Sequence, residues 1–374
     1  MQPFQFAQVL QAKRQERKIT QEEVAKFVGV TRAAVSKWEK GISYPDITLL
    51  PKLATYFDLS IDMLLGYEPQ MTKEKIDSLY ADFTKRFATE PFEIVEAVLE
   101  EIVQEYYACY PLLLRIVQLY MNYYKTATNP MAAIERAQVL VEHIKMKSTD
   151  FDIQTDAQMY EAFIYLLQGK TENVLAALGD KPIVIHGRDQ LIATAHAMNG
   201  NTEQAKEVLQ VSIYQQLLAF VSNSTELLML EMHHTVWFEE TIEKIETLIY
   251  LYKLEDVQVN TVLVFYIKTA TAYMMLQQTE ATLRMIERYI EVVERIKFPI
   301  SLHITPYFYK VEEWLHNQTQ ISMQAPRDMA SIIQDIMHVF SGNPLFAALQ
   351  ENETYQKLMK RLALIEQKGG NEHE

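Results

Sequence analysis

The residues whose types come closest to metal chemistry are Glu231, His233 and His234. A carboxylate and two imidazoles are ligands that zinc accepts. On a helix, however, adjacent side chains point about 100° apart, so His233 and His234 are poorly arranged to face one ion. We therefore expect no metal site at these residues, and no cofactor elsewhere in the chain.

A second group of reactive side chains lies between residues 106 and 124, where six tyrosines accompany the only cysteine, Cys109. Such aromatic-rich stretches pack helices together more often than they stack nucleic-acid bases. A lone cysteine cannot form an internal disulfide and is expected here as a small buried apolar residue. The tyrosines are Tyr106, Tyr107, Tyr110, Tyr120, Tyr123 and Tyr124.

An enzyme needs a nucleophile with its base, a phosphate-binding loop or paired catalytic carboxylates in a recognisable setting. The sequence contains no Walker loop, dinucleotide fingerprint, metalloprotease helix or nucleophile elbow. We therefore interpret the chain as non-enzymatic.

The composition indicates which elements position the remaining candidates. Only 10 of 374 residues are glycine, and Leu, Glu, Ala, Gln, Lys and Met are plentiful, which favours an almost purely α-helical protein of two or three domains. No signal peptide marks the N-terminus, and no stretch approaches the ~18 apolar residues of a membrane span. We expect a cytoplasmic protein without a membrane partner.

The formal charge of -14 would by itself argue against binding to nucleic acid. The charge is unevenly distributed, however. Residues 1–66 contain nine Lys or Arg and seven Asp or Glu, a net charge of +2, which leaves 26 basic and 42 acidic residues, a net charge of -16, for the rest. The acidity belongs to the second part of the chain.

Helix-capping signals divide the first 66 residues. Thr20 and Glu23 form a capping box, which predicts a helix start, and Gly29 suits its left-handed end. Thr31 then caps a second short helix extending to about Lys40, with Val35 and Trp38 facing inward.

Three further helices complete this predicted unit. A stop at Gly41 precedes Asp46, which can cap a helix carrying Leu49, Leu50, Leu53, Ala54 and Phe57. Ser60 caps one more short helix, and an N-terminal helix presents Phe6 and Leu10. Five helices are therefore expected around one small core.

This pattern resembles the phage-repressor or Xre-type helix-turn-helix family over residues Phe6 to Gly66. The resemblance rests on Thr-Gln-Glu-Glu at 20–23, Gly-Val-Thr at 29–31, Val-Ser-Lys-Trp-Glu-Lys-Gly at 35–41 and Pro-Asp at 45–46. It implies that the second helix of the pair enters the major groove of duplex DNA. Arg32 would then donate to guanine, Ala33 would contact a thymine methyl, and Lys37 would reach a base or a phosphate.

The resemblance also implies roles for flanking residues. Gln21 corresponds to a phosphate anchor at the start of the preceding helix. Arg14 and Glu39 correspond to a partly buried ion pair that holds the domain together. The remaining expected DNA contacts are Thr31, Ser36, Lys40, Ser43 and Tyr44. The alternative for Arg32, Lys37, Ser43 and Tyr44 is an ordinary solvated surface.

A break at residues 67–71 predicts a linker, followed by a helical domain over 72–368 and a disordered tail over 369–374. Within the helical domain, residues 165–178, 196–209 and 273–286 share a helix–turn–helix pattern with Thr-Glu at 171, 202 and 279. The sequence distances between these Thr-Glu pairs resemble one or two periods of tetratricopeptide repeats. We predict an all-α protein, a five-helix helix-turn-helix domain followed by an α-solenoid of tetratricopeptide-like helix pairs; generic antiparallel helix pairing is the alternative.

This combination of domains is similar to the peptide-responsive quorum-sensing regulators of Gram-positive bacteria. The similarity implies a homodimer on an inverted-repeat operator, gated by a short signalling peptide or another small effector. Candidate effector-binding residues are Asn223, Asn260, Tyr266 and Tyr273, with packing or ordinary surface as the alternative. Two other interpretations stay open: a ligand-independent repressor or antitoxin-type regulator, and a scaffold that its DNA-binding unit merely localises.

Overall fold

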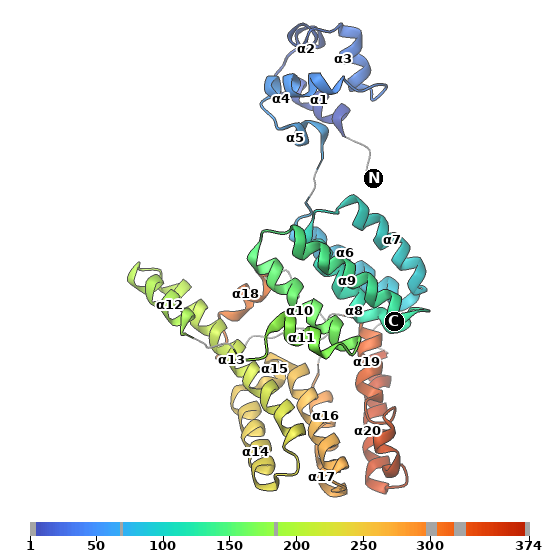
Figure 1. The fold of residues 1–374 in the computed structure, drawn as a ribbon, viewed down its shortest axis with the longest axis vertical. Coiled ribbons are helices and arrows are strands. Elements are labelled where there is room, and N and C mark those ends of the chain that lie inside the picture. The colour runs from blue at the N-terminus through green and yellow to red at the C-terminus, as the bar shows by residue number, and fades with distance from the viewer. Residues whose placement is uncertain (1–4, 68–69, 183–185, 297–304, 318–326, 371–374) are drawn as a thin grey trace. The chain divides into compact units, whose positions relative to one another are not determined.

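The computed structural model describes residues 5–67, 70–182, 186–296, 305–317 and 327–370, and every regular element in these ranges is a helix (Figure 1). The chain divides into two compact units. The first contains residues 1–80 and 91–164, and the second contains residues 81–90 and 165–374. Within the described ranges no helix has the length and apolar character that crossing a membrane would require.

The chain begins with five short α-helices and one 3-10 helix. They are α1 (Phe6–Glu16), α2 (Gln21–Val28), α3 (Arg32–Glu39), η1 (Ile47–Leu49), α4 (Leu50–Phe57) and α5 (Ile61–Leu65). The predicted caps are confirmed: the Thr20 capping box is complete, and Thr31 and Ser60 accept from backbone N–H groups three residues later.

The Asp46 cap differs from the prediction. Its carboxylate accepts from Thr48 N at 2.9 Å, only two residues along, and so begins the 3-10 helix η1. The α-helix starts later, at Leu50, with Pro51 in its first turn. Proline is tolerated there because the first N–H groups of a helix have no partner within the helix.

The core of these helices has eleven buried members, which include the residues predicted to face inward. Leu49 and Leu50 are only partly buried and pack at its edge. The buried residues are Phe6, Leu10, Val24, Ala25, Val28, Val35, Trp38, Leu53, Ala54, Phe57 and Leu64.

Five longer α-helices and one short 3-10 helix follow, and α7, α8 and α9 begin near a proline. They are α6 (Lys73–Thr89), α7 (Phe92–Glu105), α8 (Tyr110–Tyr123), η2 (Tyr124–Thr126), α9 (Pro130–Lys147) and α10 (Phe151–Leu167). In the tyrosine-rich stretch, Tyr120, Tyr123 and Cys109 are buried, as expected for packing residues. Tyr107 differs, because it is 53% exposed and its ring lies 4.0 Å from that of His143.

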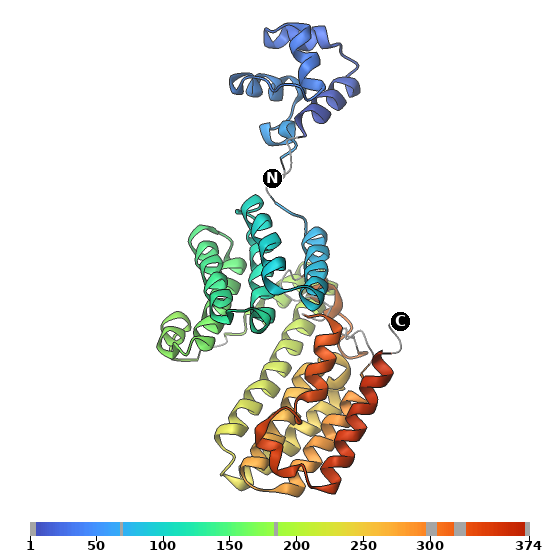
Figure 2. The same cartoon turned by 90° about the vertical axis from the view of Figure 1, so that its right-hand side faces the viewer.

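The rest of the described chain is also helical. Its elements are α11 (Thr171–Leu178), α12 (Arg188–Met198), α13 (Thr202–Leu230), α14 (Thr235–Tyr252), α15 (Leu254–Val257), α16 (Val259–Met275), α17 (Thr279–Val293), α18 (Val311–Asn317), α19 (Met329–His338), η3 (Pro344–Leu349) and α20 (Glu353–Gly370). Helices α13, α14, α16 and α17 run alongside one another in both views (Figures 1 and 2). Helix α20 continues to Gly370, and residues 371–374 of the expected tail lie outside the described ranges.

The three segments with the Thr-Glu pattern share one turn. Each turn has a residue with positive φ two positions before the threonine: Gly169 at 70°, Gly200 at 79° and Gln277 at 59°. In each, the N–H of the next residue donates to the carbonyl five positions back, at 2.8, 2.8 and 2.9 Å. The same turn also follows α2 at Gly29, so it is not specific to these segments. The pairing of helices is seen in the packing of α12 along α13 and of α16 along α17.

Candidate nucleic-acid interface and a groove in the helical region

The turn between α2 and α3 fixes the direction of the candidate recognition helix. Gly29 has φ of 82°, and the N–H groups of Gly29 and Val30 both donate to Ala25 O at 2.9 Å. This left-handed conformation favours glycine because a Cβ is disfavoured there. The Thr31 hydroxyl then accepts from Ala34 N at 3.2 Å and starts α3.

Helix α3 divides cleanly into a buried side and an exposed side. Val35 and Trp38 are buried in the domain core, whereas Arg32, Ala33 and Lys37 are exposed. At about 100° per residue, positions 33 and 37 lie opposite the two core residues, and Arg32 flanks them at the helix start. Exposed Lys40 and half-buried Ser36 fall on the same outward side.

A hollow of about 480 Å³ lies at the N-terminus of α2. Its lining brings Gln21, at the helix start, together with Arg32 from α3; the full lining is Arg14, Ile19, Thr20, Gln21, Glu22 and Arg32. A helix N-terminus has free N–H groups and a positive dipole end, both of which favour an anion. The hollow therefore combines two of the expected DNA-contacting residues with a local field that suits a phosphate.

Arg14 and Glu39 form a bidentate ion pair beneath this hollow. Arg14 Nε lies 2.6 Å from Glu39 Oε1 and Nη2 lies 3.0 Å from Oε2, while Nη1 donates to Ile19 O at 3.0 Å. The side chains are 16% and 4% exposed, and the hydrogen bond that Arg14 donates to Glu39 raises the pKa of Arg14. The pair thus joins α1 to the end of α3.

Gln21 extends this network. Its amide nitrogen donates to Glu39 Oε2 at 2.8 Å. An amide nitrogen carries two hydrogens, so one is left for a ligand such as a phosphate oxygen. The ion pair therefore orients Gln21 as well as joining two helices.

The other expected phosphate contacts lie outside the hollow. Thr31 is exposed, Ser43 is half-buried, and Tyr44 is 54% exposed with its ring 6.1 Å from that of Phe6. Because the Thr31 hydroxyl accepts as a cap, its hydrogen is free to donate.

Arg17 was not anticipated from the sequence. Its guanidinium donates to Tyr56 O at 2.6 Å and to Phe57 O at 2.7 Å, at the C-terminal end of α4. A cation at this end of a helix satisfies free carbonyl groups and complements the dipole. The partners lie about 40 residues away in the sequence, so no local pattern could have identified the contact.

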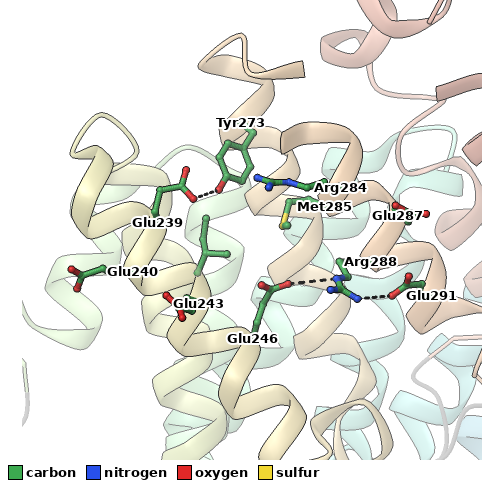
Figure 3. A pocket seen from close by; sticks show the side chains of 11 residues that line it. Glu239, Glu240, Glu243, Glu246, Tyr273, Arg284, Met285, Glu287, Arg288 and Glu291 are labelled. Carbon is green, nitrogen blue, oxygen red and sulfur yellow. Dashed lines mark hydrogen bonds and ion pairs between the residues drawn. The ribbon is translucent and has the colours of Figure 1, made fainter. Parts of the chain in front are cut away.

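A second site is a groove of about 590 Å³ with walls from α14 and α17 and Tyr273 of α16 at one end (Figure 3). Its lining includes six carboxylates and two guanidinium groups: Glu239, Glu240, Glu243, Glu246, Glu287, Glu291, Arg284 and Arg288, with Ile242, Tyr273 and Met285. Glu239 and Glu246 reach toward Tyr273 and Arg288, whereas Glu240 points away. The groove is therefore strongly acidic.

Hydrogen bonds and burial set the charges within the groove. The Tyr273 hydroxyl donates to Glu239 Oε2 at 2.7 Å, and Arg288 lies 3.0 Å from Glu291 and 4.0 Å from Glu246. Burial raises the pKa of Glu246, and burial followed by the Glu239 contact raises that of Tyr273. Burial thus favours the neutral form of Glu246, and the other carboxylates of the α14 wall, such as Glu243, can accept hydrogen bonds from a cationic ligand.

The four candidate effector residues are not gathered in one place. Tyr273 lines the groove and Tyr266 lines a smaller adjoining hollow, which shares Glu246, Arg288 and Glu291 with it. Both tyrosines are at most 5% exposed, so their rings belong largely to the core. Asn223 on α13 and Asn260 on α16 are exposed and line neither space.

The helix-turn-helix family model matches residues 10–64. The chain is 38% identical over 69 residues to the HTH-type transcriptional activator BcrR of Enterococcus faecalis, a match of 18% of this chain and 34% of that protein. The chain thus spans about a third of the length of this relative. It is 30% identical over 100 residues to the HTH-type transcriptional regulator YqaE of Bacillus subtilis, over 27% of this chain and 81% of the other.

Two solved structures show weaker likeness. The Bacillus thuringiensis PlcR complex with the peptide PapR7 and DNA has 13% identity and a TM-score of 0.30, over 84% of this chain and 99% of that one. Apo ComR from S. thermophilus has 14% identity and a TM-score of 0.24, over 78% and 94% of the two chains.

The relatives matched in sequence are transcriptional regulators and not enzymes, in agreement with the non-enzymatic interpretation. The YqaE match covers most of that relative. This chain belongs to the helix-turn-helix family of DNA-binding transcriptional regulators.

Proposed function

We propose that the protein is a homodimeric regulator that reads an inverted-repeat operator with α3. The observation that carries the proposal is the outward face of α3, where Arg32, Ala33 and Lys37 are exposed opposite a fully buried apolar side. Arginine and lysine pair with guanine, and a methyl group suits thymine, so this face matches base edges in the major groove.

The flanking residues position this helix on the DNA backbone. In the proposal, Gln21 and Thr31 donate to phosphates beside the hollow at α2, and Lys40 and Ser36 extend the contact along α3. Ser43 and Tyr44, in the loop that follows, complete the set. Contacts of this kind set register and orientation but carry no base information themselves.

In the proposal, the two segments of the chain have different tasks because they differ in net charge. Residues 1–66 form the DNA-binding domain and residues 67–71 a linker, while residues 72–368 supply dimerisation and sensing. Only the first segment has a net positive charge, and an acidic second segment has little attraction to phosphate. Separate tasks for the two segments suit this difference.

The proposed effector site is the acidic groove between α14 and α17. A cavity of about 590 Å³ falls within the range of small-molecule sites, ~300–1,000 Å³. Its excess of carboxylates favours an effector with a positively charged group, such as a short peptide with a free amine or a basic side chain. Tyr273 and Tyr266 are the candidate residues that this site retains.

Selection of bound DNA from a random duplex pool tests the proposal. The full chain, with and without cell extract, should enrich two inverted half-sites separated by one helical turn, ~34 Å, or a multiple of it. If the half-sites are enriched only when extract is present, DNA binding requires an effector. If they are enriched equally without extract, a ligand-independent repressor is favoured. Failure to enrich any sequence under either condition rejects the DNA-reading role.

A further inference from the structure

Helix α13, the longest in the described ranges at 29 residues, exposes a continuous stripe of mostly apolar side chains. The stripe, called here the α13 seam, alternates steps of four and three residues and contains Leu209, Ile213, Gln216, Phe220, Asn223, Leu227 and Leu230. All seven are exposed, with Phe220 at 53% and Leu230 at 79%.

The opposite side of α13 is already occupied. Tyr214, Val221 and Leu228 are buried in a core with α14, α16 and α18. A helix that is apolar on both sides is expected to be covered on both sides. The α13 seam is the side that the other described helices of the second compact unit leave exposed.

The spacing of the α13 seam indicates what kind of surface covers it. Steps averaging 3.5 residues are the a and d positions of a heptad, which keep one stripe facing a partner helix along its length. The seam spans three heptads, about 32 Å at 1.5 Å per residue. Because α13 is held against α14 and α16, pairing does not require a helix to form first.

The distribution of charge along α13 favours a second copy of this chain as the partner. Residues 208–225 contain no charged side chain, although 22% of the chain is charged and its net charge is -14. Most of an acidic surface would repel a second copy of itself, whereas this uncharged stretch would not. Glu226, at the end of the stretch, is ion-paired with Lys268.

The two polar members of the α13 seam select both partner and orientation. Gln216 and Asn223 are seven residues apart and so occupy the same heptad position. In a parallel pair of identical helices each amide meets its own counterpart, and amides both donate and accept. An antiparallel pair would place them opposite apolar side chains, where the amide of Asn223 would lose its counterpart at a cost, while Gln216 would keep its bond to Ser212 Oγ at 2.9 Å.

We propose that the α13 seam is the dimer interface of this regulator, where α13 pairs in parallel with α13 of a second copy of the chain. This assignment rests on the proposed homodimer and gives it residues. It also assigns Asn223 to subunit contact in place of effector binding. Phe220, at the middle of the stripe, is the central packing residue.

Sedimentation of the full chain carrying Phe220→Glu tests the interface. The matched control is Phe163→Glu, which changes a phenylalanine of similar exposure, 51%, on α10. Wild type and control should be dimers, and Phe220→Glu should raise the dimer dissociation constant at least tenfold. A Phe220→Glu protein that dimerises like the control overturns the proposal, as does a monomeric wild type.

Cysteine cross-linking provides a test that does not depend on a disruptive variant. Cys109 is buried, so Asn223→Cys adds an accessible thiol, and Ser222→Cys does the same one position off the seam. Under mild oxidation, Asn223→Cys should give a covalent dimer and Ser222→Cys should not. Equal cross-linking of the two variants, or none at position 223, rules out a parallel α13 pair.

DNA binding separates this inference from the proposed function. If the wild type dimerises and binds an inverted repeat while Phe220→Glu does both equally well, the interface assignment fails and the regulator stands. If no variant binds DNA but Phe220→Glu is monomeric, the interface stands and the proposed function fails.

Discussion

The N-terminal helices and the repeat-like helix pairs begin their helices by different means. In the first region Thr20, Thr31, Asp46 and Ser60 each accept a backbone N–H with a side chain. In the second region the residues at the starts of α11, α13 and α17 make no such side-chain bond. The helix ends do not differ, because the backbone turn with one positive φ that precedes α11, α13 and α17 also ends α2 at Gly29 and α5 at Gly66.

The difference has a physical consequence for function. Side-chain caps fix where each short helix begins, and a recognition helix must present particular side chains at a particular register. Helices α11, α13 and α17 begin without such a side-chain bond, so their starts depend on the backbone turn and on packing. Both regions share the turn, and the first adds side-chain caps to it.

The comparison is tested most strongly at the outward face of α3. Arg32→Ala combined with Lys37→Ala should weaken operator binding by about 4 kcal/mol, on the order of a thousandfold, because each base contact contributes ~1–3 kcal/mol. The measurement is fluorescence anisotropy with the selected operator at fixed salt.

The control for this pair removes the same charge elsewhere in the domain. Lys13 lies on α1, where it pairs with Glu16, and exposed Lys26 lies in the last turn of α2. Lys13→Ala combined with Lys26→Ala should change affinity only through general electrostatics, and the loss should shrink as salt rises. If the two double variants lost equal amounts of operator affinity, α3 would contribute only charge and no base contact.

The second prediction compares the ion pair of the N-terminal helices with one that joins α7 and α9. Arg14→Ala leaves Glu39, only 4% exposed, without its main partner and should destabilise the N-terminal helices by about 3 kcal/mol. Arg136→Ala leaves Glu100, 29% exposed and still bonded to the Tyr120 hydroxyl at 2.8 Å, and should cost about 1 kcal/mol. Hydrogen exchange of amides in α2 and α8 measures each region separately; equal costs would contradict the role assigned to burial.

The N-terminal helices could be predicted closely because their signals are local. Thr20 and Glu23 are three residues apart, Gly29 follows the same helix, and apolar spacing identifies Val35 and Trp38 as core. The exceptions are contacts between distant residues. Arg17 reaches the end of α4, and the Gln21 bond to Glu39 joins two helices, and neither leaves a pattern in nearby sequence.

The groove and the candidate effector residues were much harder to predict. Asn260 and Tyr266 lie on one helix, yet the first is exposed and the second is buried beside a hollow. The groove depends on how α14 packs beside α17, which no spacing within either helix reveals. The α13 seam was visible in the sequence as heptad spacing, but its exposure became evident only from the packing of α13 against α14 and α16.

A third prediction concerns a titrating group in the first compact unit. Burial, with added repulsion from Asp152 and Asp150, raises the pKa of Asp156 from 3.8 to about 6. Since the folded pKa exceeds the unfolded one, Asp156 destabilises the fold above pH 6, and this cost disappears below about pH 4. Asp156→Asn should therefore stabilise by about 1 kcal/mol at pH 7, a value reduced for partial exposure, and have little effect at pH 4.

Hydrogen exchange of α10 amides at both pH values checks this sign. Thr155→Asn, a change at the neighbouring residue on the same helix, is the control and should show no pH dependence. A benefit of Asp156→Asn that persisted at pH 4 would assign the effect to helix propensity and not to charge.

The smallest expected effects come from the shared turn, and they test whether backbone geometry alone maintains the helix pairs. Gln277 has φ of 59° where the matching turn has Gly200 at 79°. The left-handed conformation costs a non-glycine residue ~1–2 kcal/mol. Gln277→Gly should stabilise the α16–α17 pair by about 0.5 kcal/mol after the added unfolded-state entropy of glycine is counted. Gly200→Ala should destabilise the α12–α13 pair by about 1 kcal/mol, although the added Cβ meets nothing within 4 Å. Hydrogen exchange at equivalent positions measures the change in the free energy of opening for each variant. Changes of opposite sign would show that the two turns are equivalent. Changes of the same sign would show that α12–α13 and α16–α17 do not share this turn energetically.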